Sequence, residues 1–227
     1  MRSRGGHGPV SNHWSALFLS AFVTFFVVID PAGCAPIFAS LTRGASAAHR
    51  RSMAVRSTLV AAGILFVFAL FGEAFLRTLG ISLASFRIAG GIMLFLIALE
   101  MVFEKRTQRR EERADEITRK AAAEERPLEA EDIAVFPMAI PMIAGPGSIA
   151  TAMLLTSRAE GWLDGAVVLA ALLATLVLTL LSLLAAGPLM RVLGDKVEAM
   201  ITRVLGVILA ALAAQFVVDG IRVSFAL

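Results

Sequence analysis

Apolar residues in this chain form long blocks instead of a stripe that recurs every three to four positions. A bilayer core about 30 Å thick needs roughly 20 apolar residues per helix, and six segments reach that length. The ten-residue alternation that marks transmembrane barrels is missing from the sequence, so the backbone must pair its polar groups within helices. The pattern predicts an all-α membrane protein with spans at 14–41, 58–76, 81–103, 133–157, 162–190 and 199–221.

Composition agrees with this class, since 58% of the residues are hydrophobic and 17% are charged. The net charge of +3 comes from short basic runs between the apolar blocks. We therefore expect a lipid bilayer as the main partner and no nucleic acid. One cysteine, Cys34, and the scattered histidines His7, His13 and His49 offer no metal cluster, and we expect neither metal nor cofactor.

A charged linker at 104–132 divides the single membrane domain, 1–227, into two halves of three spans, 10–103 and 133–227. Its ten acids and eight bases are typical of a water-facing connector. If the chain begins outside the cell, the cytoplasmic side receives fifteen of the 21 lysines and arginines. The positive-inside rule therefore predicts a cytoplasmic linker and two extracytoplasmic termini.

The two halves share traces of similarity. Pro31 and Pro36 in the first span match the spacing of Pro141 and Pro146 in the fourth, and Arg-x-x-Gly opens both the third and the sixth span. Because three is odd, the second half must enter the membrane from the opposite side. This predicts an inverted repeat, which secondary transporters use for alternating access. The alternative is chance placement of proline and glycine, which are frequent in membrane helices.

The first and fourth spans are predicted to be broken, because each proline removes a backbone donor and leaves a carbonyl without its usual partner. We expect new helices to begin near Ile37 and near Ser148, with Ser148 as a cap. Free N–H groups there attract a carboxylate, and the freed carbonyls can accept from an ammonium group. Simple kinks for packing are the alternative. The predicted substrate-binding residues are Asp30, Pro31, Gly33, Pro36, Pro141, Gly145, Pro146, Gly147 and Ser148.

Asp30 is the most informative of these side chains, because a carboxylate inside a span implies a functional partner. It could bind a substrate ammonium or carry a coupling proton. The alternative is that it caps the unwound turn by accepting backbone N–H bonds. Glu100, near a helix end, is assigned to the interface. Weaker candidates for gating or coupling are Arg87, Arg203 and Gln215.

The two proline motifs resemble those of a known family. The stretch DPAGCAPIF at 30–38 resembles the D-P-x-G-x-x-P-x-F signature of the MarC family, and PMIAGPGSI at 141–149 resembles its P-x-x-x-G-P-G-x-I signature. The resemblance covers nearly the whole chain. It implies a six-helix bacterial inner-membrane protein that is related to LysE-type exporters and is grouped with neutral amino-acid transporters.

The leading functional hypothesis is a secondary transporter of small neutral amino acids or similar zwitterions, coupled to a proton or sodium gradient. The sequence holds no G-x-x-x-x-G-K-[ST] loop, which excludes ATP-driven transport within this chain. The alternative is a non-transporting accessory or scaffold protein. No enzymatic activity is expected, because no span contains a histidine or a recognisable catalytic dyad. Gly90 and Gly91 could support packing within or between protomers, which leaves a homo-oligomer open.

Overall fold

A computed structural model describes residues 10–103, 108, 109, 112, 116 and 134–225, so most of the charged linker lies outside the described residues. All regular elements in the described part of the chain are helical. In chain order they are α1 (Val10–Ile29), α2 (Pro31–Leu41), α3 (Ala47–Thr78), α4 (Leu83–Val102), η1 (Ala134–Ile143), α7 (Pro146–Thr156), α8 (Trp162–Leu184) and α9 (Ala186–Phe225).

These helices account for six spans. Five are long and apolar enough to cross a membrane, with α1 and α2 together forming the first, His13–Leu41. The bent pair Phe136–Ile143 and Pro146–Thr156, with 47° between its helices, forms the sixth. The prediction of an all-α protein with six spans is therefore consistent with the described helices. The predicted end of the fifth span at Met190 is wrong, because α8 ends at Leu184 and residues beyond Ala185 already belong to α9.

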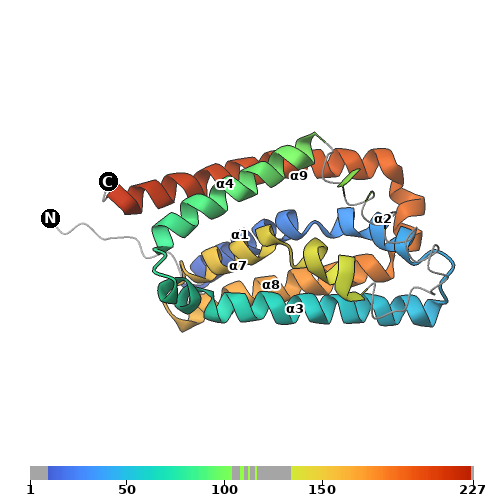
Figure 1. The fold of residues 1–227 in the computed structure, drawn as a ribbon, viewed down its shortest axis with the longest axis horizontal. Coiled ribbons are helices and arrows are strands. Elements are labelled where there is room, and N and C mark those ends of the chain that lie inside the picture. Colours follow the sequence, from blue (N-terminus) through green and yellow to red (C-terminus); the bar gives the residue numbers. More distant parts are fainter. Residues whose placement is uncertain (1–9, 104–107, 110–111, 113–115, 117–133, 226–227) are drawn as a thin grey trace.

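The helices form three layers, which Figure 1 shows from the side. Helices α4 and α9 lie side by side in one outer layer, and α3 and α8 form the other. The two broken spans lie between these layers, so that α1 and α7 contact each other and each also contacts outer helices. Helix α1 begins and α9 ends at the same end of the bundle, as an even number of spans requires.

Glycines allow α4 and α9 to approach closely. A Cβ atom added at Gly91, Gly206 or Gly220 would lie within 2.7–2.9 Å of an atom of the facing helix. In lipid, such close backbone approach supplies the packing that a hydrophobic driving force supplies in water. Gly91 faces Ala213 and Val217, Gly206 faces Ala98 and Met101, and Gly220 faces Ala84 and Ile88. This order shows that α4 and α9 run antiparallel.

Replacement of Gly91 by alanine is expected to destabilise the protein by roughly 1–3 kcal/mol, because overpacked contacts force the helices apart. The new Cβ would lie 2.8 Å from the Ala213 carbonyl oxygen, which is backbone and cannot rotate away. Thermal unfolding of the purified protein in detergent measures the change. Gly63→Ala is the matched control, since a Cβ at that position of α3 meets nothing within 4 Å. Equal unfolding temperatures for the two variants would contradict the prediction.

Candidate functional site

The break in the first span consists of one residue. Asp30 has φ 59° and ψ 67°, in the left-handed region, and α2 begins directly after it at Pro31. The expectation that a new helix begins near Ile37 is therefore wrong. Proline is favoured in the first turn of a helix, where its missing N–H would have had no partner. Pro36 then lies inside α2, so the two prolines do not enclose an unwound segment.

Asp30 folds back over the start of α2. Its Oδ1 atom accepts from the Gly33 N–H at 3.0 Å, and its carbonyl oxygen accepts from the Cys34 N–H at 3.0 Å. Gly33 is required for this arrangement, because a Cβ there would lie 2.2 Å from Asp30 Oδ2. The carboxylate, with Asp30 only 1% exposed, thus occupies the positive end of the α2 dipole. The capping role is confirmed, and a solute-binding role for Asp30 stays a prediction.

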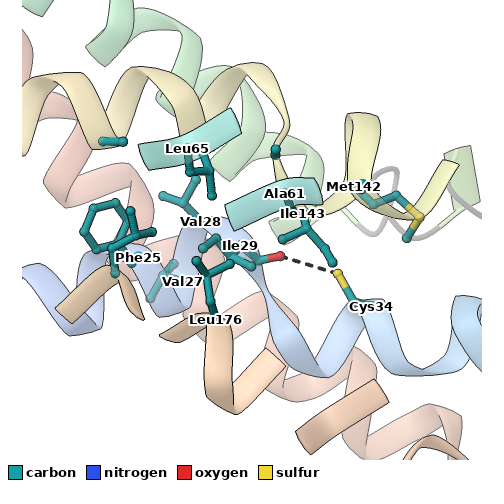
Figure 2. Packing of buried hydrophobic residues seen from close by; sticks show 14 of the residues in the cluster. Phe25, Val27, Val28, Ile29, Cys34, Ala61, Leu65, Met142, Ile143 and Leu176 are labelled. Atoms are coloured by element: carbon teal, nitrogen blue, oxygen red, sulfur yellow. Dashed lines mark hydrogen bonds between the residues drawn. The ribbon is translucent and has the colours of Figure 1, made fainter. Parts of the chain in front are cut away.

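Cys34 contributes a bond that the sequence did not predict. Because the Gly33 N–H is directed to the Asp30 side chain, the carbonyl of Ile29 loses its usual donor four residues on. The Cys34 thiol donates to that carbonyl with an Sγ···O distance of 3.6 Å, as Figure 2 shows. Buried residues from three other helices surround the break. They include Leu65 of α3, Ile143 of η1 and Leu176 of α8.

The break in the fourth span is more irregular. Phe136 and Ile140 have extended φ/ψ values inside η1, and each precedes a proline, which disfavours the helical region for the residue before it. Helix α7 then begins at Pro146 with Gly145 as its N-cap residue, and no side chain caps it. The expected Ser148 cap is wrong, because Pro146 takes the first helical position and places Ser148 third. Gly145 is also constrained, since a Cβ there would lie 2.4 Å from the Pro141 carbonyl oxygen.

A cavity of about 180 Å³ lies at this second break. Five of the predicted binding residues line it: Pro141, Gly145, Pro146, Gly147 and Ser148. The four predicted residues of the first break, Asp30, Pro31, Gly33 and Pro36, are not part of its lining. Val28, which comes two residues before Asp30, does line it. The second proline motif therefore lines one cavity, whereas none of the predicted binding residues of the first motif lines it.

Backbone polar groups give this cavity its chemistry. The N–H groups of Gly147 and Ser148 belong to the first turn of α7, where no side chain caps them. The Pro137 and Met142 carbonyls lack their α-helical donors, because the residues four positions on are prolines. Both carbonyl residues line the cavity. The site therefore combines unpaired donors at a positive helix end with acceptors on the other side of the bend.

Glu100 and Arg109 add charge to the same cavity. Their side chains form an ion pair, and both residues line the cavity at the end of α4. The sequence predicts an interfacial position for Glu100, because this residue is close to a helix end, whereas the structure places it in the cavity lining. The sequence feature that marks Glu100 is an acidic residue in the last turn of an otherwise apolar span. Arg109 belongs to the charged linker and could not be paired from sequence alone.

A second polar cluster lies at the opposite end of α4 and α9. Arg158, in the loop between α7 and α8, pairs with Asp219 of α9, with Nη2···Oδ2 at 2.5 Å, and its guanidinium lies 4.6 Å from the centre of the Phe216 ring. Gln215 donates to Asp219 Oδ1 at 2.7 Å. Burial lowers the pKa of Arg158, Asp219 opposes this shift, and Arg87 adds to it.

Two of the three predicted gating residues thus belong to one cluster. Gln215 contacts Asp219 directly, and Arg87 is close enough to act electrostatically on Arg158. The Nε atom of Arg87 is buried and has no hydrogen-bond partner. Arg203 lies elsewhere, one turn before Gly206, which packs against the other end of α4. Arg87 and Arg203 occupy equivalent positions in the two halves of the sequence, but they lie at opposite ends of the α4–α9 pair.

Replacement of Asp30 by alanine is expected to destabilise the protein by about 1–2 kcal/mol, because the cap of α2 is lost and alanine disfavours the left-handed region. Asp30→Asn is the matched control, since asparagine keeps the acceptor oxygen and tolerates this backbone conformation. Gly33→Ala should resemble Asp30→Ala, because it displaces the carboxylate. Thermal unfolding in detergent compares the three variants, and an Asp30→Asn protein as unstable as Asp30→Ala would contradict the capping account.

Comparison with known proteins identifies the family. The model of the MarC family of integral membrane proteins matches residues 15–225. A UPF0056 membrane protein of Methanocaldococcus jannaschii is 39% identical over 90% of this chain and 96% of its own length. The UPF0056 inner membrane protein YhgN of Escherichia coli K12 is 36% identical over 90% and 95%, respectively. No solved structure matches. This chain, with two proline breaks in its six helical spans, belongs to the MarC family of integral membrane proteins.

Proposed function

We propose that this protein is an inner-membrane secondary transporter of small neutral amino acids or similar zwitterions. The observation that carries the proposal is the cavity at the uncapped N-terminus of α7. Its volume of about 180 Å³ is below the roughly 300–1,000 Å³ of sites for drug-sized ligands. A small solute therefore suits it better than a large amphiphile.

The polar groups of the cavity match the two charges of a zwitterion. A carboxylate would accept from the N–H groups of Gly147 and Ser148, where the helix dipole is positive. An ammonium group would donate to the carbonyls of Pro137 and Met142, with Glu100 as an anionic residue of the same lining. In this proposal Asp30, Pro31, Gly33 and Pro36 act indirectly, because the one-residue break that they form positions Val28 in the cavity wall.

Internal pseudo-symmetry supports the inverted repeat in this proposal. Helices α2 and α7 each have 11 residues and each begin with a proline, Pro31 and Pro146. These prolines are 115 positions apart, which agrees with the 116 between Arg87 and Arg203 better than the 110 between Pro31 and Pro141.

Helix contacts support the same relation. The first broken span packs against α8 and α9, and the second packs against α3 and α4. If the two halves of the chain are exchanged, α3 and α4 correspond to α8 and α9. Each set of contacts then becomes the other. The antiparallel course of α4 and α9 is the direction that an inverted repeat requires.

The two ion pairs lie at opposite ends of the helix bundle, where the two openings of an alternating-access transporter would be. The Glu100–Arg109 pair borders the cavity at the end where α4 enters the charged linker. The Arg158–Asp219 pair ties the α7–α8 loop to α9 at the other end. We propose that the second pair is a gate which closes that end in the present state, with Arg87 and Gln215 as its neighbours. A coupling proton or sodium ion would bias the exchange between the two states.

Reconstituted protein is expected to show saturable uptake of alanine, glycine or serine under a proton or sodium gradient. Gly147→Leu should abolish it, because the new side chain would extend from the α7 N-terminus among Ile97, Leu94 and Val28. Gly63→Leu is the matched control, since Gly63 is exposed on α3 and a Cβ there meets nothing within 4 Å.

Uptake by Gly147→Leu at the wild-type rate would contradict this location of the site. Absence of uptake across the panel by folded wild-type protein would favour the accessory role. Size-exclusion chromatography of each variant establishes that it is folded.

Opening of the proposed gate is expected when Asp219 is replaced by asparagine. Loss of a partly exposed ion pair worth up to about 1 kcal/mol shifts a two-state population roughly fivefold. A Ser148→Cys probe in a Cys34→Ser background, labelled with an impermeant thiol reagent, reports access to the cavity from each side of oriented vesicles. Labelling from the Arg158 side should rise about fivefold in Asp219→Asn.

The charge-swapped variant Arg158→Asp/Asp219→Arg serves as the control. It should restore the low wild-type labelling, because it re-forms the ion pair with exchanged partners. Unchanged labelling of Asp219→Asn would contradict the gate.

A further inference from the structure

A second cavity, of about 430 Å³, lies at the junction of four helices and shares no lining residue with the proposed solute site. Its walls are the end of α2, the turn into α3, and the connection between α8 and α9. Three arginines line it: Arg43 in the turn, and Arg50 and Arg51 in the first turns of α3. Within the described residues no carboxylate forms an ion pair with them, and all three arginines are exposed.

Apart from Thr42, the remaining lining of this cavity is apolar. Phe38, Leu183 and Leu184 line it, and Ala186, Gly187 and Pro188 line it from the start of α9. Leu183 is buried, whereas Leu184 is 45% exposed and turns outward from the bundle. The cavity therefore has a strongly basic side and an adjoining apolar side that is continuous with the outer surface.

Its position along the bundle corresponds to the lipid headgroups. Helix α3 has 32 residues and is therefore about 48 Å long, which exceeds the hydrocarbon core of about 30 Å. The excess lies at the start of the helix, because Arg50 and Arg51 precede the apolar stretch that begins at Thr58. These first turns therefore extend into the headgroup layer or beyond. Arg43 lies in the turn that precedes α3, at the same end.

We propose that this cavity binds the phosphate headgroup of an anionic phospholipid. Arginine forks pair with phosphate oxygens, and basic pockets between membrane helices recognise anionic headgroups. The apolar wall decides between the two sources of a phosphate group. Leu184 and Pro188 would contact the glycerol backbone and the start of the acyl chains, which a free phosphate ion would leave exposed to water.

The lipid would act as a clamp on a part of the bundle that moves in an alternating-access cycle. The cavity joins α2, which belongs to the first broken span, to the connection between the outer helices α8 and α9. The binding site itself does not depend on transport, because it rests on the arginines and the apolar wall. Its test therefore needs no transport measurement.

Native mass spectrometry and thermal unfolding of the full-length protein in detergent, with added phosphatidylglycerol or phosphatidylcholine, test the proposal. Wild type should retain phosphatidylglycerol preferentially and unfold at a higher temperature in its presence. Arg43→Gln/Arg50→Gln should weaken this binding about tenfold or more, since each arginine contributes to the attraction. Arg77→Gln/Arg222→Gln is the matched control, because it also removes two positive charges, near the other ends of α3 and α9.

Three outcomes would overturn the proposal. They are equal retention of the two lipids by wild type, an equal loss of binding in both double variants, and full displacement of the lipid by millimolar inorganic phosphate. The last result would identify a site for a free anion. If Arg43→Gln/Arg50→Gln does not fold, Arg43→Lys/Arg50→Lys replaces it. This variant keeps the charge and loses the fork geometry, and wild-type affinity in it would likewise overturn the arginine–phosphate contact.

Discussion

The backbone of a broken helix has no water to pair with inside a bilayer, and this constraint governs the centre of the molecule. Each break must satisfy its own N–H and carbonyl groups, lie against other helices, or border a cavity. The first break satisfies them internally: the Asp30 carboxylate accepts from Gly33, and the Cys34 thiol donates to Ile29. The second break leaves donors and acceptors beside a cavity. The outer layers of α3, α8, α4 and α9 enclose both breaks.

The difference between the breaks depends on which residue stands at each N-cap. An aspartate before Pro31 supplies a negative charge to the positive end of α2, and Gly33 leaves room for it. Before Pro146 stands Gly145, which supplies no side chain and therefore leaves the end of α7 open to another anion. Two helices that begin alike thus differ in function under the proposal, one as a fixed support and the other as a binding surface.

The sequence predicted the features that depend on local rules. Span number followed from apolar length, and the two breaks followed from proline, although α2 begins at Pro31 and not near Ile37. The helix boundary at Leu184 was missed, although Gly187 and Pro188 follow it closely in the first turn of α9. The sequence pattern could not predict contacts between segments that are distant in the chain. Glu100 could not be assigned to the cavity, nor Arg158 to Asp219, because both relations depend on how α4, α7 and α9 pack.

The packing of α4 on α9 links these sites into one mechanical unit. Both helices are held at close range by glycines, so neither can move far without the other. Glu100 lies at one end of this pair and Asp219 at the other. A tilt of the pair against the central layer would open one end as it closes the other. Under the proposed function, the Arg158–Asp219 bond and the solute cavity are therefore coupled through a rigid lever, and no contact between them is needed.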